Sequence, residues 1–227
     1  MTRTHSKRFL EAQQKLPKGK TPLKEAVEAL KQLAPAKFDQ TVELAMHLGI
    51  DPRQPDQALR GSVALPHGIG ATKKVVAFCD AADADKAKAA GAIDAGADDL
   101  IKKIQDGWMD FDVAVATPAM MRSVSRLGRL LGPQGKMPSP KAGTVVDDIL
   151  TAVREFSAGK IEYRNDDGGS LHVSVGKISF DAQKLVDNIE AFVAHVRRIK
   201  PPTAKGQYIR KACISATMSP SIQVDLQ

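Results

Sequence analysis

Residues 74–79 read Lys-Val-Val-Ala-Phe-Cys and contain the longest unbroken apolar run of the chain. A short apolar run of this kind is typical of a strand that is buried on both faces. Residues 111–116, Phe-Asp-Val-Ala-Val-Ala, form a second such run. The segments 83–91 and 97–105 between them have helical character. Strands that alternate with helices predict a doubly wound, Rossmann-like α/β domain with a parallel sheet.

The next part of the chain continues this pattern. Thr117 and Pro118 predict the start of a helix that runs to about Leu131. Residues 132–143 contain three prolines and three glycines, which predict a surface loop. A further helix is expected over residues 145–157.

Toward both ends of the chain, apolar residues recur at every second position instead of in continuous runs. Residues 41–50 alternate strictly between apolar and other residues, which predicts a half-buried strand. Asn165-Asp166-Asp167-Gly168-Gly169 is typical of a hairpin turn. Further strands are expected at 62–65, 160–165, 171–175, 208–217 and 221–226. Two amphipathic helices are expected, at 22–33 with Thr21 as N-cap and from Asp181 to about Ile199.

The change of period predicts two domains. Residues 1–67 and 156–227 are expected to fold together as an α+β domain with a split chain. Residues 68–155 are expected to form the inserted α/β domain. Gly68, Gly70 and Gly159 lie near the predicted crossings and are candidate hinge residues.

Electric charge follows the same division. The chain has 33 basic and 26 acidic residues, a formal charge of +7, and all of the excess lies in the two end segments. This favours an anionic partner such as nucleic acid. Within the neutral central segment, residues 113–146 carry five cations and no carboxylate, which predicts one basic surface. These cations are Arg122, Arg126, Arg129, Lys136 and Lys141.

Several function classes are disfavoured. Gly68 and Gly70 precede a strand, whereas a dinucleotide-binding motif places its glycines after one. The loop from Gly132 to Lys136 lacks the first glycine and the hydroxyl residue of a P-loop. The five histidines and two cysteines show no metal-ligand spacing. We therefore expect no enzyme activity, no cofactor and no metal, although a nucleotide-binding central domain is the alternative to test.

The class of partner can be narrowed further. No apolar run approaches the length of a membrane span, and no signal-like segment follows the basic start, so the expected location is cytoplasmic, with no membrane partner. Ten aromatic residues are few for a single-strand stacking surface, so structured RNA is favoured. A basic module that binds another RNA or a protein is the alternative.

Many short motifs then stand in the order and spacing of one family. They are Phe38-Asp39-Gln40-Thr41-Val42-Glu43, Leu48-Gly49-Ile50-Asp51-Pro52-Arg53, Arg60-Gly61-Ser62-Val63, Leu65-Pro66-His67-Gly68, Ala116-Thr117-Pro118, Leu131-Gly132-Pro133, Met137-Pro138, Lys141-Ala142-Gly143-Thr144-Val145, Lys205-Gly206 and Thr217-Met218. Over about residues 20–225 the chain resembles the ribosomal protein L-one family, bacterial type. The resemblance implies a large-subunit protein that binds ribosomal RNA at the mobile side stalk. It also implies help in releasing deacylated tRNA from the exit site and repression of the protein's own messenger RNA.

The resemblance also implies particular site residues. Those expected to bind RNA are Lys37, Phe38, Thr41, Glu43, Arg53, Asp166, Lys205, Thr217, Met218 and Ser219. The cations of residues 113–146 are the expected surface toward tRNA. For Phe38 and Met218 a place in the core is the alternative.

The chain departs from the family pattern at four positions. Ser219 stands for a usual glycine, Ala71 and Asp167 for frequent lysines, and Gln134 for a usual arginine. The serine could strain the backbone or press against RNA, or its hydroxyl could contact the RNA.

The charge distribution generates a first prediction. A shortened chain in which a short linker joins residue 67 to residue 156 should fold and keep most of the RNA affinity, because the segments with the excess positive charge are retained. Circular dichroism would verify folding, and filter binding beside the full chain would measure affinity. A folded short chain that no longer binds would contradict the prediction.

Overall fold

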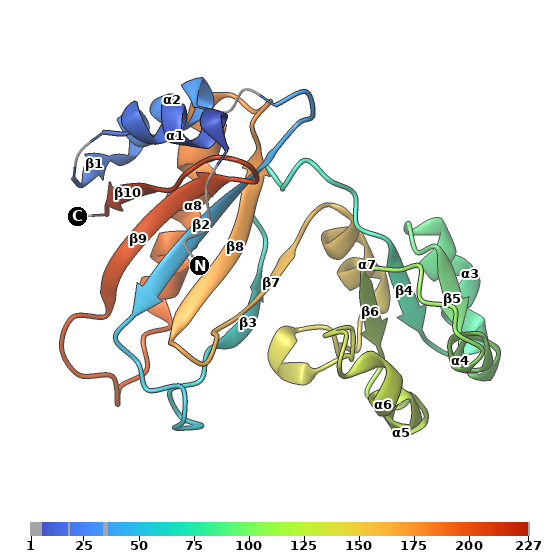
Figure 1. Cartoon of the computed structure of the whole chain (residues 1–227). Coiled ribbons are helices and arrows are strands. Elements are labelled where there is room, and N and C mark those ends of the chain that lie inside the picture. Colours follow the sequence, from blue (N-terminus) through green and yellow to red (C-terminus); the bar gives the residue numbers. More distant parts are fainter. Residues whose placement is uncertain (1–5, 18, 34–35, 227) are drawn as a thin grey trace. The chain divides into compact units, whose positions relative to one another are not determined.

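The computed structural model describes residues 6–17, 19–33 and 36–226, and the chain divides into two compact units (Figure 1). Unit 1 comprises Met1–Leu59, Leu65–Gly70 and Tyr163–Gln227, and unit 2 comprises Arg60–Ala64 and Ala71–Glu162. Among the described residues, no helix has the length and apolar character needed to span a membrane.

Unit 1 is built on a five-stranded sheet with the strand order β1-β10-β9-β2-β8. Its strands are β1 (Thr21–Pro22), β2 (Thr41–Leu48), β8 (Ser170–Lys177), β9 (Ile209–Ala216) and β10 (Ile222–Asp225). Strand β2 pairs antiparallel with both β8 and β9, whereas β1 and β10 are parallel. The helices of this unit are α1 (Lys7–Gln14), α2 (Leu23–Gln32) and α8 (Ala182–Arg198). Helices α2 and α8 contact each other and the sheet.

The alternation in β2 explains this layering. Val42, Leu44, Met46 and Leu48 are fully buried or nearly so, whereas the residues between them are half-buried or exposed. The apolar faces of α2 and α8 are also buried, and α2 packs on β9 and β10 while α8 packs on β8. The sheet of unit 1 therefore has one covered face and one polar face, as the sequence predicts for a half-buried strand.

Two expectations for unit 1 require correction. Thr21 pairs with Val224 in the sheet, so Pro22 takes the N-cap position of α2 without a side-chain cap. The turn at residues 165–169 does not join a hairpin, because β8 pairs with β2 while β7 (Ile161–Arg164) pairs with β3 (Arg60–Val63). A single bridge, between Asn165 and Leu171, connects the two sides of the turn. Helix α1 was not predicted.

Unit 2 contains a parallel sheet with the order β5-β4-β6. Its strands are β4 (Val75–Phe78), β5 (Asp94–Gly96) and β6 (Val113–Ala116). Its larger helices are α3 (Ala81–Ala89), α4 (Asp98–Gln105) and α7 (Ile149–Ser157). Val75 and Ala77 pack in a core cluster with Phe156 of α7, whereas Val76 and Phe78 pack in a second cluster with Ile104 of α4. Both faces of β4 are thus buried, and the predicted α/β class with a parallel sheet is confirmed.

The predicted helix up to Leu131 is interrupted. The chain forms α5 (Met121–Val124), the 3-10 turn η1 (Ser125–Leu127) and α6 (Gly128–Leu131) in its place. Gly128 lowers helix propensity in the middle of this segment. The loop 132–143 contains one further 3-10 turn, η2 (Pro140–Ala142).

The observed units differ from the expected domain boundaries in three short segments. Residues 60–64 and 156–162 lie in unit 2, whereas residues 68–70 lie in unit 1. Phe156 belongs to the core cluster of unit 2, which keeps the end of α7 there. Residues 60–64 lie close to η2, since a Cβ atom on Gly143 would come within 2.8 Å of the Ser62 hydroxyl.

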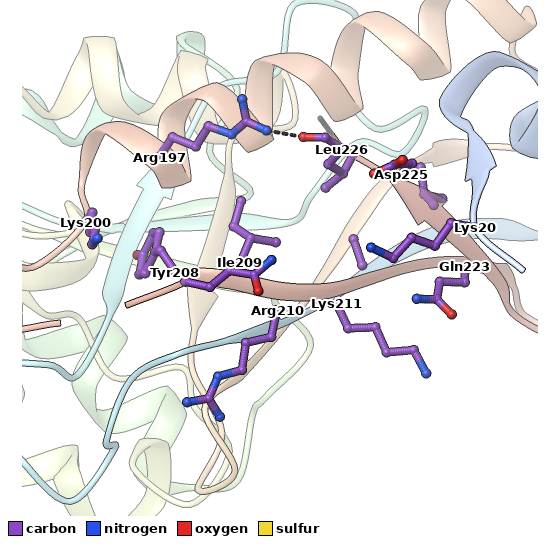
Figure 2. Close-up of a pocket in the computed structure, with 13 residues that line it drawn as sticks. Lys20, Arg197, Lys200, Tyr208, Ile209, Arg210, Lys211, Gln223, Asp225 and Leu226 are labelled. Atoms are coloured by element: carbon purple, nitrogen blue, oxygen red, sulfur yellow. Dashed lines mark hydrogen bonds between the residues drawn. The ribbon is translucent and has the colours of Figure 1, made fainter. Parts of the chain in front are cut away.

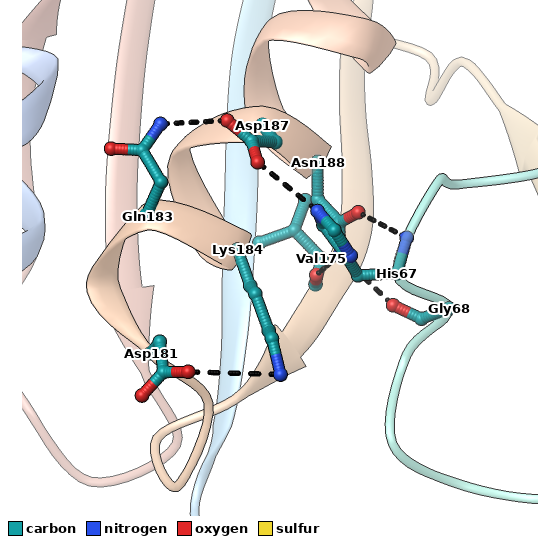
Figure 3. A network of polar contacts seen from close by, with 8 residues as sticks. All are labelled: His67, Gly68, Val175, Asp181, Gln183, Lys184, Asp187 and Asn188. Carbon is teal, nitrogen blue, oxygen red and sulfur yellow. Dashed lines mark hydrogen bonds and ion pairs between the residues drawn. The ribbon is translucent and has the colours of Figure 1, made fainter.

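A buried asparagine secures the segment that leads out of unit 1 (Figure 3). Asn188 of α8 has no exposed surface; its Oδ1 accepts from the backbone N–H of His67 at 3.1 Å. Its Nδ2 donates to the carbonyls of Gly68 at 2.9 Å and Val175 at 2.8 Å. Beside it, the His67 ring lies 3.0 Å from Asp187. One side chain thereby holds residues 67–68 to both α8 and β8.

We predict that Asn188→Ala lowers the free energy of unfolding of unit 1 by about 2–4 kcal/mol. The substitution leaves a buried N–H and two carbonyls without their partner. Glu190→Ala, an exposed position on the same helix, is the matched control and should change stability by less than about 0.5 kcal/mol. Urea unfolding would be followed by far-UV circular dichroism and by the fluorescence of Trp108, the single tryptophan, in unit 2. An Asn188→Ala protein as stable as the control would contradict the proposed role of this network.

Candidate nucleic-acid interface

Three strands meet at one end of the sheet of unit 1. Thr41 begins β2, Lys177 ends β8, and Thr217 follows the last residue of β9. The backbone N–H of Thr217 donates to the carbonyl of Thr41 at 3.2 Å, and the N–H of Thr41 donates to the hydroxyl of Thr217 at 3.2 Å. Lys177 Nζ donates to the Thr41 hydroxyl at 2.9 Å. Residues separated by more than a hundred positions in the sequence thus form one small polar surface.

Two large apolar side chains lie exposed at this end of the sheet. Phe38 and Met218 are both 53% exposed, so the alternative that places them in the core is wrong. Between them, the Oε1 atom of the buried Gln40 accepts from the N–H of Met218 at 2.9 Å. The Asp39 carboxylate accepts from the N–H and the hydroxyl of Ser179. These bonds hold the backbone on both sides of the exposed side chains.

Glu43 projects from the polar face of the sheet. Its neighbours across the strands are Ser174 of β8 and Ser215 of β9. Its side chain is exposed, and no ion pair of the described residues involves it. A carboxylate in this position can accept hydrogen bonds from a ligand. We call this region the strand-end surface; it consists of Phe38, Thr41, Glu43, Lys177, Thr217 and Met218.

The other predicted RNA-binding residues divide into two groups. Lys37 is exposed directly before the strand-end surface, and Ser219 follows Met218. Arg53, Asp166 and Lys205 are exposed near the other end of the sheet, after β2, before β8 and before β9 respectively. The predicted residues therefore do not form one cluster.

Asp166, one of the predicted RNA-binding residues, also has a structural role. Its Oδ1 accepts from the N–H groups of Ser170 at 2.6 Å and Gly168 at 2.9 Å. These bonds, above all that from Ser170, hold the pKa of Asp166 below its ordinary value. The carboxylate thus stabilises its own turn.

Lys177 and Gln40 contribute to this region but are not among the predicted site residues. Lys177 stands in no local pattern that indicates binding, and Gln40 lies within the motif at residues 38–43 without having been assigned a role. Lys177 reaches Thr41 only because β8 pairs with β2 in the observed register, and Gln40 is buried. Pairing between distant strands supplied this part of the surface.

In unit 2, Arg122, Arg126, Arg129 and Lys141 are exposed. Lys136 is different, because its Nζ donates to the carbonyl of Met109 and lies 5.0 Å from the centre of the Phe111 ring. Four of the five predicted cations are thus available to a ligand of this unit. Among the residues that the structure describes, no group of three metal-binding side chains comes together.

The three candidate hinge glycines have positive φ angles. The values are 61° for Gly68, 70° for Gly70 and 105° for Gly159. A Cβ atom at Gly70 would also lie 2.8 Å from the ring of Phe180. Glycine is therefore required there by both conformation and space.

The protein family that matches this chain and its individual relatives agree with one another. Residues 30–220 match the ribosomal protein L1p/L10e family. The chain is 49% identical over 223 residues to large ribosomal subunit protein uL1 of Kosmotoga olearia, covering 98% of this chain and 96% of that protein. It is 49% identical to the protein of the same name from Lactobacillus gasseri, covering 97% and 96% of the two chains. For the Protochlamydia amoebophila protein the identity is 48%, covering 98% and 94%.

Ser219 closes the turn beside Met218 without strain. Every positive φ angle among the described residues belongs to a glycine, so the alternative in which the serine strains the backbone is wrong. Its hydroxyl accepts from the N–H of Ala216 at 2.9 Å and lies 3.2 Å from the carbonyl of Pro220. Short polar side chains at turns commonly bond to nearby backbone in this way.

We predict that Ser219→Gly lowers stability by about 1 kcal/mol, the net contribution of one hydrogen bond, and weakens RNA binding by a similar amount. Loss of the hydroxyl releases the turn that presents Met218. Ser219→Ala separates loss of the hydroxyl from the added freedom of glycine, and both would be measured by urea unfolding and RNA filter binding. Tighter binding by the glycine variant would instead show that the serine Cβ atom holds RNA away.

Proposed function

Because the chain belongs to the ribosomal protein L1p/L10e family, we propose that it is a structural constituent of the large ribosomal subunit and binds ribosomal RNA of the side stalk through unit 1. This role requires no catalytic group, and it locates the protein in the cytoplasm with the ribosome. The observation that carries the RNA-binding proposal is the strand-end surface, where exposed apolar and polar groups are fixed by pairing between strands.

The chemistry of this surface suits RNA. Phe38 and Met218 offer apolar area against which bases or riboses can pack. Lys177 supplies a positive charge beside the hydroxyls of Thr41 and Thr217. Phosphate contacts of this kind position an RNA, whereas contacts with base edges and 2′-hydroxyls select it.

Glu43 is the unusual member of the strand-end surface. A carboxylate repels the phosphates of any nucleic acid that approaches it, so it weakens non-specific binding. It can accept a hydrogen bond from a 2′-hydroxyl, which DNA lacks. We assign this residue the selection of RNA over DNA.

We further propose that unit 2 contacts exit-site tRNA through Arg122, Arg126, Arg129 and Lys141. These side chains are exposed in a region that contains no carboxylate from residue 113 to residue 146. Phosphates of a tRNA are the matching anions. The hinge glycines would allow the unit to follow the tRNA as it leaves.

The strand-end surface would also bind the protein's own messenger RNA wherever that messenger reproduces the ribosomal site. The same contacts would then repress translation. Support for this part comes from the family and from the RNA chemistry of the surface.

The role of Glu43 can be tested by the sign of the change in RNA affinity when its charge is removed. Glu43→Gln removes a negative charge, so a merely solvated carboxylate predicts tighter binding to a side-stalk RNA. We predict about 10-fold weaker binding, because the change replaces a hydrogen bond to a charged acceptor, about 1.5–3 kcal/mol, by one to a neutral acceptor, about 0.5–1.5 kcal/mol. Glu190→Gln makes the same change of charge on α8 and is the control.

The measurement is filter binding to the RNA and to its 2′-deoxy form. The wild type should prefer the RNA, and the Glu43→Gln protein should lose most of this preference. Tighter binding of both ligands by Glu43→Gln would contradict the assignment.

A further inference from the structure

A second cationic feature lies at the end of the unit 1 sheet away from the strand-end surface (Figure 2). A hollow of about 400 Å³ opens where β9 begins and β10 ends. Five cationic side chains and one carboxylate line it: Lys20, Arg197, Lys200, Arg210, Lys211 and Asp225. We call this hollow the bulge groove.

A β-bulge produces the charge density of this groove. His47 of β2 pairs with Lys211 of β9, but the next residue, Leu48, pairs with Ile209. Arg210 is therefore an extra residue, and a bulge of this type can turn two successive side chains to one side of the strand. Arg210 and Lys211 are both exposed and leave the strand on the same side in Figure 2.

Three of these cations form no ion pair among the described residues: Lys20, Arg210 and Lys211. Arg197, by contrast, donates to the carbonyl of Leu226, and Lys200 lies 5.9 Å from the centre of the Tyr208 ring. The three cations are thus available to an anionic ligand, and their positive charge attracts one.

The position of the groove indicates an extended anion. Lys211 lies opposite His47, which stands on the same face of β2 as Glu43. Lys211 and the strand-end surface are therefore at opposite ends of one polar sheet face, whereas Arg197 reaches the groove from α8 on the other face. Thr217 stands six positions after Lys211 along β9 and the residue that follows it, a span of about 20 Å. A single polyanion can reach both ends.

An acidic protein segment is a weaker match. Protein partners are usually held by large apolar or aromatic anchors. The exposed large apolar residues among those described are Leu10, Phe38, Ile93, Leu130 and Met218, and none of them lines the groove. Arginine and lysine without such an anchor suit phosphates, which arginine can hold in bidentate fashion.

We propose that the bulge groove binds the phosphodiester backbone of a second segment of the same RNA that occupies the strand-end surface. This inference rests on the proposed RNA-binding function and extends it to a second contact. Arg210, Lys211 and Lys20 hold phosphates, and the bulge gives Arg210 and Lys211 a common direction.

The test compares salt dependence for an RNA that contains the complete side stalk. Arg210→Gln with Lys211→Gln should reduce the slope of log K against log salt concentration by about 1.4–1.8, the equivalent of two phosphate contacts. Lys24→Gln with Lys184→Gln removes the same charge from exposed positions on α2 and α8 and should leave the slope nearly unchanged. Arg210→Lys with Lys211→Arg keeps both charges and should retain the wild-type slope. Circular dichroism would confirm that all variants fold.

Hydroxyl-radical footprinting of the same complexes adds a second measurement. The Arg210 and Lys211 double glutamine variant should lose protection of one RNA segment while keeping the segment that depends on Glu43. Equal slopes and footprints for this variant and the wild type would overturn the inference but leave the proposed function in place. The inference would also be overturned if the double glutamine variant kept the wild-type slope but no longer bound a polyglutamate peptide. That result would assign the groove to an acidic protein segment. Failure of the wild type to bind the RNA would instead reject the proposed function.

Discussion

The register of β2 between β8 and β9 is the constraint on which unit 1 depends. Val42, Leu44, Met46 and Leu48 must all face the helices, and a slip by one residue would exchange this row for Glu43 and His47. The cost of burying a carboxylate without a partner makes such a slip prohibitive. The same register places Thr41 beside Thr217 and Lys177. Core packing at one face therefore fixes the polar chemistry at the other.

Sequence patterns predicted those features that depend on neighbours along the chain. The alternation of residues 41–50 indicated β2, and the apolar run after Lys74 indicated β4. The sequence patterns failed where the interacting residues are far apart along the chain. The turn at residues 165–169 was interpreted as a hairpin, yet the buried row of β8 packs with β2 and draws the strand into another sheet. For the same reason, Lys177 and the bulge at Arg210 gave no signal in the sequence.

The candidate site shows a related division between short and long side chains. The Asp166 carboxylate and the Ser219 hydroxyl bond to backbone within their own turns. Short polar groups reach nearby N–H groups easily, so interpreting every such residue as a ligand contact overestimates the site. Lysine side chains are longer, and their length has two opposite consequences. Lys136 folds back onto the Met109 carbonyl, whereas Lys177 joins a surface that local sequence did not suggest.

The distribution of charge over the polar face shows how the proposed binding would combine affinity with selectivity. In that proposal, the cations at the bulge groove would raise the affinity for any nucleic acid, because each phosphate contact releases counterions. Glu43 at the other end would act against this general attraction and would favour only a ligand that offers it a hydrogen-bond donor. Since β9 connects both ends, the sheet sets the distance between the two proposed contacts. An RNA would then gain the full binding energy only when its shape presents a phosphate and a donor at that separation.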